Sequence, residues 1–142
     1  MLIVVSAYSV CMADIRVLIV DDVERVRQDL RTFLTLTGNI EVVAEAGDGS
    51  EAIHLVETLH PQVVLMDLEM PVMDGFEATR QIKAFQPSCR VIALTIHAGE
   101  NEQQTAMQAG ADDFIVKGAS LERLLESIRK APITRQTNQE GE

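Results

Sequence analysis

Short apolar runs alternate with amphipathic stretches through most of this chain. Each run is four to seven residues long and rich in Val and Ile, which is typical of a strand buried on both faces of a sheet. The runs that predict strands are 16–20, 40–46, 63–66, 90–95 and 113–116.

A helical pattern follows each of these strands, with apolar residues recurring three or four positions apart. The positions or segments that predict the five helices are Val23, Val26, Leu30, Phe33 and Leu34; Ala52, Leu55, Val56 and Leu59; 75–85; 102–109; and Leu121, Leu124, Leu125 and Ile128. Segment 102–109 is poor in large apolar residues and predicts the weakest helix. The residues expected to cap or end these helices are Gly38-Asn39, His60-Pro61, Asp74, Gly110 and Ser120.

Alternating strands and helices predict a parallel sheet that is covered by helices on both faces. Right-handed crossovers leave few ways to connect it, and the doubly wound order 2-1-3-4-5 is the commonest at this size. The expected fold class is α/β, a three-layer sandwich around a five-stranded parallel sheet. Its binding crevice should lie at the carboxyl ends of the strands, between strands 1 and 3.

The periodic pattern covers residues 14–131, which we expect to form one domain. We expect residues 1–13 to be an N-terminal extension and residues 132–142 a flexible tail or linker, because the tail is polar and aperiodic. Residues 1–11 are interpreted as an upstream start or extension, and the alternative is an extra strand or an apolar docking arm. N-terminal sequencing that finds 1–11 intact would contradict the start-site interpretation.

Charge and composition argue against several classes of function. The 142 residues carry a formal net charge of −10, so the protein as a whole should repel nucleic acid and anionic membranes. The apolar run 2–5 is too short to cross a bilayer and lacks the features of a signal peptide. Two cysteines, Cys11 and Cys89, are too few for a disulfide framework and fit a reducing compartment. We therefore expect a cytoplasmic protein with no direct binding of nucleic acid or membrane.

Polar residues follow the ends of four of the five strands. They are Asp21 and Asp22 after strand 1, Asp67 after strand 3, Thr95 at the end of strand 4 and Lys117 after strand 5. Because strands 1 and 3 are neighbours in the expected order, the three carboxylates should converge. Taken singly, each residue also has an ordinary explanation, as an N-cap, a turn residue, a strand-end threonine or a solvated lysine.

Three carboxylates in one pocket repel one another unless a cation compensates, and Mg²⁺ suits a site of two or three carboxylates. A carboxylate, Mg²⁺, a lysine and a hydroxyl together suit phosphoryl transfer, because each charged phosphoryl oxygen needs a cation or donor. A carboxylate can itself be the nucleophile and form an aspartyl phosphate. Asp67, at the middle of the rim, is the best candidate.

Four segments, in this order and spacing, resemble the receiver domain of two-component response regulators: "VLIVDD", "VVLMDLEMPVMDGFEATRQIK", "VIALT" and "FIVKG". The resemblance covers about 16–131 and implies a flavodoxin-like fold and phosphorelay signal transduction. It implies that a sensor histidine kinase or a histidine phosphotransfer protein phosphorylates Asp67. It also implies a phosphoprotein that is no enzyme beyond self-catalysed phosphotransfer and slow autodephosphorylation.

The resemblance assigns the metal ligands. It implies that Asp22, Asp67 and the backbone carbonyl of Glu69 bind Mg²⁺, and that Asp21 helps through water. No other cofactor is implied.

The resemblance also implies a switch. Thr95 and Lys117 would contact the phosphoryl group, and Phe114 would swing inward as Thr95 moves. Phosphorylation would then bias two packings of the face formed by the fourth helix, the fifth strand and the fifth helix. That face is expected to bind or release a partner, or to form a phosphorylation-dependent homodimer.

Some positions depart from the family's usual pattern. Ile96 stands where the family has a small residue, and Glu69 and His97 occupy positions that tune dephosphorylation there. We predict a changed phosphoryl lifetime, and a wild-type-like decay rate in Ile96→Ala would count against it. Gly118 replaces the frequent proline after Lys117, and "KGAS" resembles receivers joined to helix-turn-helix output domains. The chain is interpreted as a fragment of such a protein or as a stand-alone relative.

Three other functions remain as alternatives. A haloacid-dehalogenase-type phosphatase also uses an aspartate nucleophile with an acid two residues later, here Asp67 and Glu69, but the order of the remaining motifs fits poorly. Dinucleotide or flavin binding is suggested only by "GDGSEA", which follows the wrong strand. A pseudo-receiver that acts without phosphorylation is the third, and it stays open because of Ile96.

Overall fold

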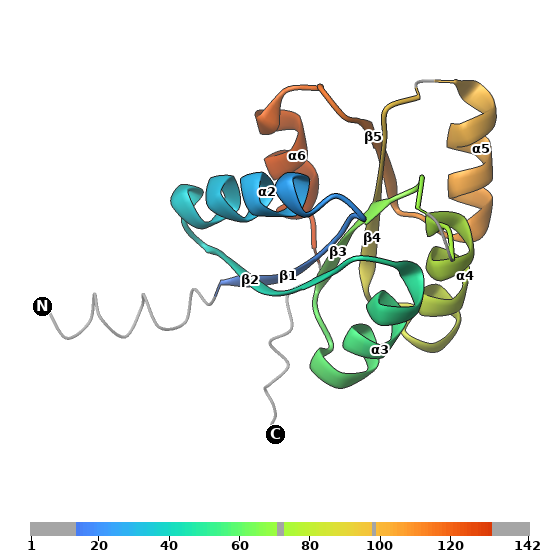
Figure 1. Cartoon of the computed structure of the whole chain (residues 1–142), viewed down its shortest axis with the longest axis horizontal. Coiled ribbons are helices and arrows are strands. Elements are labelled where there is room, and N and C mark those ends of the chain that lie inside the picture. The colour runs from blue at the N-terminus through green and yellow to red at the C-terminus, as the bar shows by residue number, and fades with distance from the viewer. Residues whose placement is uncertain (1–13, 71–72, 98, 132–142) are drawn as a thin grey trace, which may run out of the picture.

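Five parallel strands form the centre of the computed structural model, which describes residues 14–70, 73–97 and 99–131. The strands are β1 (Ile15–Val20), β2 (Ile40–Ala46), β3 (Val63–Asp67), β4 (Arg90–Thr95) and β5 (Asp113–Val116). Their order across the sheet is β2-β1-β3-β4-β5, and all neighbours are parallel (Figure 1). The predicted α/β class and doubly wound order are confirmed. The predicted extension and tail lie outside the described residues.

Helices cover both faces of this sheet. They are α2 (Glu24–Thr37), α3 (Gly49–Leu59), α4 (Gly75–Phe85), α5 (Glu100–Ala109) and α6 (Leu121–Ile128). Figure 1 shows α2 and α6 on one face and α3, α4 and α5 on the other. In β1, Val17 and Ile19 pack with α2 and α6, whereas Leu18 and Val20 pack with α3 and α4. All four are at most 1% exposed, and burying each side chain of this kind stabilises the fold by about 1.5–3 kcal/mol.

Local signals begin or end the helices where the sequence predicts. The side chains of Ser120 and Asp74 cap α6 and α4 by accepting hydrogen bonds from the N–H groups of Arg123 (3.2 Å) and Glu77 (2.9 Å). The residues with positive φ that follow α2, α3 and α5 are Gly38 (80°), Asn39 (64°), His60 (51°) and Gly110 (109°). These local stops explain why the observed boundaries follow the sequence closely.

The first turns of α2 and α6 differ from the predicted apolar faces. Val23 and Leu121 fall on those faces by spacing, yet they are 48% and 49% exposed, so that part of the prediction is wrong. Val23 is the N-cap of α2 and Leu121 is the first residue of α6, so each stands at a helix end, before the buried face begins. The alternative that Asp21 or Asp22 caps α2 is excluded, because Val23 occupies that position.

The weak helix is confirmed. α5 begins at Glu100, two residues before the predicted start, because Gly99 already has the extended backbone of an N-cap. Its buried residues are only Ala106 and Ala109, so α5 contributes little apolar area to the core. Because both buried residues are small, α5 has little side-chain packing to lose if it moves.

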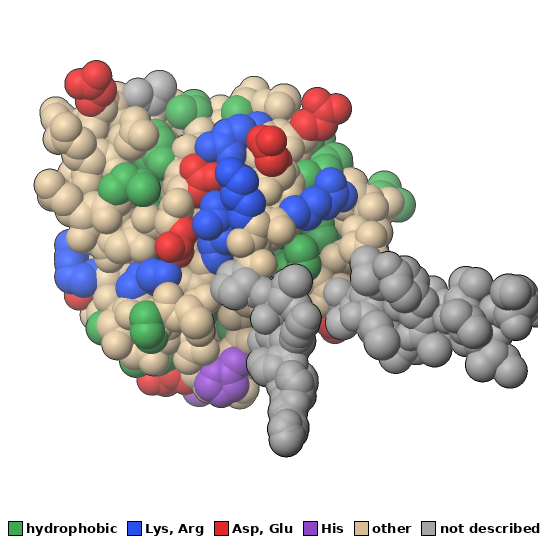
Figure 2. Space-filling view, turned by 180° about the vertical axis from the view of Figure 1, so that it is seen from behind, with side chains coloured by type: hydrophobic (Ala, Val, Ile, Leu, Met, Phe, Trp, Pro, Cys, Tyr) green, Lys and Arg blue, Asp and Glu red, His purple; other side chains and the backbone are tan. Residues whose placement is uncertain are grey.

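Cations and acids are interspersed on the rear surface. Seen from behind, the Lys and Arg side chains gather near the middle of the face, with Asp and Glu side chains among them (Figure 2). Two cations from distant parts of the chain, Arg90 and Arg123, both pair with Asp113. None of the helices in the described part of the chain combines the length and apolarity that crossing a bilayer requires.

Candidate functional site

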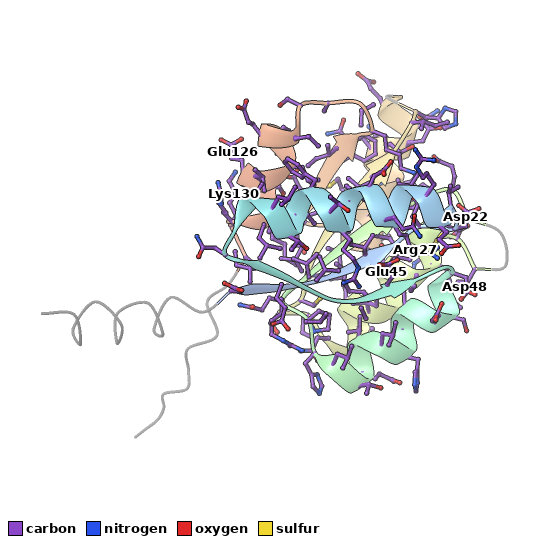
Figure 3. All side chains as sticks on the ribbon, turned by 60° about the vertical axis from the view of Figure 1, so that its left-hand side comes forward. Asp22, Arg27, Glu45, Asp48, Glu126 and Lys130 are labelled. Atoms are coloured by element: carbon purple, nitrogen blue, oxygen red, sulfur yellow. The ribbon has the colours of Figure 1, made fainter. Side chains whose placement is uncertain are left out.

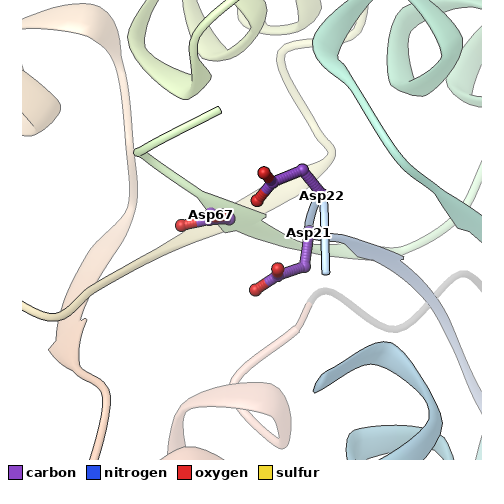
Figure 4. Close-up of side chains that lie close together, drawn as sticks. All are labelled: Asp21, Asp22 and Asp67. Carbon is purple, nitrogen blue, oxygen red and sulfur yellow. The ribbon is translucent and has the colours of Figure 1, made fainter. Parts of the chain in front are cut away.

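Three carboxylates meet at the carboxyl edge of the sheet. Asp21 and Asp22 follow β1, and Asp67 ends β3, the strand beside it. One oxygen from each carboxylate lies within 4.8 Å of the others, and the three side chains point toward the same space (Figure 4). Asp21 and Asp67 are 1% and 2% exposed, whereas Asp22 is exposed. The structure therefore brings together the three acids that the strand order predicts.

Lys117 joins two of these acids. It follows β5, and its Nζ donates hydrogen bonds to Asp21 Oδ2 at 2.9 Å and to Asp67 Oδ1 at 3.1 Å. These bonds tie the end of β5 to the ends of β1 and β3. The ammonium group thus supplies one positive charge to a cluster of three carboxylates, which leaves the cluster with a net negative charge.

Thr95 lies at the same edge but is held by other groups. Its side chain is completely buried, and its Oγ1 donates to Glu69 Oε2 at 2.5 Å and accepts the N–H of His97 at 3.0 Å. The hydroxyl is therefore occupied by Glu69, a contact that the sequence analysis did not predict. Thr95 and Lys117 are also connected directly, because the Lys117 N–H donates to the Thr95 carbonyl oxygen at 2.6 Å.

Glu69 also contacts the central acid through its backbone. Its N–H donates to Asp67 Oδ1 at 3.2 Å, while its side chain reaches Thr95. Neither contact involves the Glu69 carbonyl oxygen, so the metal-binding role expected of that atom stays a prediction.

The remaining expected residues lie around the cluster. Phe114 is half-buried in β5 and packs against an apolar group of Leu68, Ala93, Ala106 and Ala111 rather than against the carboxylates. Ile96 is 64% exposed, and His97 is exposed as well. Ile96 directly follows Thr95 in the chain and is exposed, and its effect on phosphoryl lifetime stays a prediction.

Gly75 is a residue of the site that the sequence analysis treated only as a helix start. A Cβ atom at this position would lie 2.2 Å from the Asp67 carbonyl oxygen and 2.8 Å from Leu68 Cα. The first residue of α4 therefore packs directly on the backbone that carries Asp67. The sequence signal was the glycine itself, eight residues after the last residue of the strand, but only the packing shows what it approaches.

Burial makes the central carboxylate hard to ionise. Desolvation, followed by the charge of Asp21, raises the pKa of Asp67 to about 6, although Lys117 and the Glu69 N–H act in the opposite direction. Burial would lower the pKa of Lys117, but its hydrogen bonds and charge interactions with Asp21 and Asp67 outweigh this and raise it. A further cation would relieve the remaining repulsion. The donor set consists of carboxylate oxygens, which fits Mg²⁺ rather than a softer metal.

Comparisons with known proteins agree with this geometry. The family model described as "Response regulator receiver domain" matches residues 17–129. Response regulator protein VraR of Staphylococcus saprophyticus is 41% identical over 116 residues, which cover 82% of this chain and 56% of VraR. The chain thus spans little more than half the length of that relative.

Two solved structures show the same fold. One is a two-component response regulator of the LuxR family from Aurantimonas, with a TM-score of 0.79, 30% identity and coverage of 91% of this chain and 90% of that one. The other is the CheX-CheY-BeF3-Mg complex from Borrelia burgdorferi, with a TM-score of 0.76, 28% identity and coverage of 83% and 89%.

Proposed function

This chain belongs to the response regulator receiver domain family, and from that premise we propose that Asp67 accepts a phosphoryl group from a phosphohistidine. The donor is a sensor histidine kinase or a histidine phosphotransfer protein. The observation that carries the proposal is the position of Asp67, buried at the end of β3 between Lys117 and two further acids. Residues 14–131 act as the receiver domain.

The transfer is a substitution at phosphorus. An Asp67 carboxylate oxygen forms the new P–O bond, the P–N bond to the donor histidine breaks, and the imidazole leaves with the electron pair and takes up a proton. Asp67 must be ionised to attack. Because burial raises its pKa to about 6, neighbouring cations that stabilise the carboxylate favour the reactive form.

The acidic cluster holds Mg²⁺ in this proposal. Asp21, Asp22 and Asp67 supply carboxylate oxygens, with Asp21 acting through water, and the Glu69 carbonyl completes the protein ligands. When bound, Mg²⁺ neutralises charge that develops on the phosphoryl oxygens. The ends of β1 and β3 hold one oxygen of each carboxylate close to the others, where they can bind the ion together.

Lys117 and Thr95 would respond to the new group. Phosphorylation adds roughly two negative charges and three acceptor oxygens to Asp67. Lys117, already 3.1 Å from Asp67 Oδ1, can pair with one phosphoryl oxygen. Thr95 can donate to another after it leaves Glu69, and Phe114 then moves inward. Because α5 buries so little, the face formed by α5, β5 and α6 shifts and binds or releases a partner, or forms a homodimer.

The proposed setting is cytoplasmic, and this chain itself does not contact nucleic acid, in keeping with its net charge of −10. Beyond self-catalysed phosphotransfer and slow autodephosphorylation it has no enzymatic activity.

Intact mass spectrometry after incubation with Mg²⁺ and acetyl phosphate tests the proposal. We expect one added phosphoryl group in the wild type and none in Asp67→Asn. Asp74→Asn is the matched control, because Asp74 is a nearby exposed acid whose capping role Asn can keep. No phosphorylation of the wild type would refute the proposal. Rapid release of phosphate from small phosphoesters would instead support the phosphatase alternative.

A further inference from the structure

We propose that Arg27 is a positioning residue of the acidic site, which fixes the Asp21–Asp22 turn by binding the Asp21 carbonyl oxygen and is itself held by Glu45. This inference rests on the proposed function, because its consequence is tighter binding of Mg²⁺. Arg27 lies in α2, one turn beyond the acidic pair, and contacts no carboxylate of the cluster among the described residues.

The turn is held at every polar atom of Asp21. Its N–H donates to the Ala46 carbonyl at 3.0 Å, its Oδ1 accepts the Val23 N–H at 2.9 Å, and its Oδ2 accepts Lys117. The remaining atom, the carbonyl oxygen, accepts Arg27 Nη1 at 2.6 Å. That carbonyl belongs to the peptide unit between Asp21 and Asp22, so Arg27 sets the orientation of the backbone from which Asp22 projects.

Asp22 depends on this backbone. Its side chain is exposed, and within residues 14–70, 73–97 and 99–131 it has no hydrogen bond or ion pair of its own. Nothing in that part of the chain other than the backbone therefore directs its carboxylate toward Asp21 and Asp67. A ligand residue whose backbone is fixed loses less conformational freedom when it binds a cation. Groups that hydrogen-bond to metal ligands and orient them usually increase metal affinity in this way.

Arg27 is held by Glu45, a residue of β2, the strand that pairs with β1. Its Nε donates to Glu45 Oε1 at 3.1 Å, and the side chains are only 17% and 22% exposed. Figure 3 shows Asp22, Arg27 and Glu45 toward the end of the molecule at which α2 begins. Burial opposes ionisation of Glu45, but Arg31 and Arg27 outweigh it and hold its pKa below the usual value. Glu45 is therefore a charged anchor that joins β2 to the turn after β1.

Arginine is suited to this position because its guanidinium reaches both groups at once. Nε donates a hydrogen bond to Glu45 while Nη1 donates one to the Asp21 carbonyl oxygen, whereas a lysine ammonium has a single nitrogen for both acceptors. Because Arg27 binds the Asp21 carbonyl oxygen and not its carboxylate, it leaves the carboxylate oxygens of the cluster available for a metal ion.

The chain contains a matched control for a purely structural role. Arg31 donates to the other oxygen of Glu45, Oε2, at 2.5 Å, and it does not contact the Asp21 turn. Arg31→Ala and Arg27→Ala therefore each remove one ion pair between α2 and Glu45. Only Arg27→Ala also frees the Asp21 carbonyl.

Calorimetric titration with MgCl₂, on full-length chains shown to be folded by circular dichroism, tests the inference. We expect Arg27→Ala to weaken Mg²⁺ binding about ten-fold, in the range typical of groups behind metal ligands. Arg31→Ala should stay within about two-fold of the wild type. Arg27→Lys keeps the charge but loses the double contact, so it should also bind weakly; it replaces Arg27→Ala if that variant does not fold.

Three outcomes overturn the inference. Wild-type affinity for Mg²⁺ in Arg27→Ala would show that the Asp21–Asp22 turn keeps its shape without Arg27. Equal weakening in Arg31→Ala would show that only the ion pairs with Glu45 matter. Wild-type affinity in Arg27→Lys would show that a positive charge at this position is sufficient. A wild-type chain that binds no Mg²⁺ refutes the metal site of the proposed function as well, so the two failures are distinguishable.

Discussion

At the scale of single residues, the site places function and stability in opposition. Asp67 is 2% exposed and lies beside Asp21, Lys117 is its only cationic partner among the described residues, and its pKa is raised to about 6. Its ionised form is therefore destabilising at neutral pH, although a phosphoacceptor needs that form. A metal ion that binds only the folded state would offset this penalty.

Asp67→Asn should therefore stabilise the metal-free protein at pH 8, by on the order of 1–2 kcal/mol. An acid whose pKa is higher in the folded than in the unfolded state stabilises the fold when protonated. The wild type should regain this stability as the pH falls through about 6, and the gap should close below about pH 4. Urea unfolding with EDTA, from pH 4 to 8, measures the gap; an Asn variant less stable than the wild type at pH 8 would contradict it.

At the scale of elements, the helices differ in how firmly they are attached. α4 buries Gly75, Ala78, Thr79 and Ile82, and Gly75 packs on the backbone of β3. α5 buries only Ala106 and Ala109. The helix that follows Thr95 can thus shift at a lower free-energy cost than α4, whereas the helix that follows Asp67 is fixed to the site.

Native-state hydrogen exchange should show this difference. We expect amides of α5 to exchange through local opening at a lower free energy than those of α4, because less apolar surface must be exposed. Phosphorylation or a phosphoryl mimic should change protection in α5 more than in α4. Equal protection factors in the two helices would count against α5 as the mobile part of the switch.

At the scale of the whole molecule, an ionic network joins the first residues of β4 and β5 to α6. It lies at the opposite ends of these strands from Thr95 and Lys117. Asp113, the first residue of β5, accepts hydrogen bonds from Arg123 (2.9 and 3.1 Å) and from Ser127 (2.6 Å) in α6. Arg90, the first residue of β4, pairs with the same carboxylate at 3.5 Å and donates to the Ser127 carbonyl. The network holds β4, β5 and α6 together.

Asp113→Asn should destabilise the protein at neutral pH, by about 1–2 kcal/mol. Burial opposes ionisation of Asp113, but the bonds from Arg123, Ser127 and the Phe114 N–H outweigh it and lower its pKa to about 2. A lowered pKa stabilises the fold above the ordinary value of 3.8, and this is lost as the pH falls through about 2. The deficit of the variant should therefore shrink in acid because the wild type loses stability there, whereas protonation of Asp67 makes the wild type more stable as the pH falls.

Denaturant unfolding from about pH 7 down to about pH 2 measures this effect, because the deficit changes only below the ordinary pKa of 3.8. Asp29→Asn is the control, because the Asp29 side chain is 72% exposed and, in the part of the chain that the structure describes, its one ion pair is with Arg25 on the same helix. We expect no measurable change there. A deficit of Asp113→Asn that is constant with pH would show that packing, and not the charge, accounts for its contribution.

The sequence by itself determined the order and type of the elements, most of their boundaries and the edge at which the polar groups meet. Apolar periodicity, caps such as Ser120 and stops such as His60 act within a few residues, so they can be read from the chain. Strand order then placed Asp21, Asp22 and Asp67 together, because the carboxyl ends of neighbouring parallel strands share one edge.

Only the tertiary structure decided which partner each of these groups has. Glu69 accepts a hydrogen bond from the Thr95 hydroxyl, and Arg27 donates one to the Asp21 carbonyl oxygen. Gly75 leaves room for the backbone of Asp67. Val23 and Leu121, apolar by pattern, are exposed. Such outcomes depend on distances of a few ångströms between elements that are far apart in the chain. Those distances come from packing of the whole domain, which a local pattern does not encode.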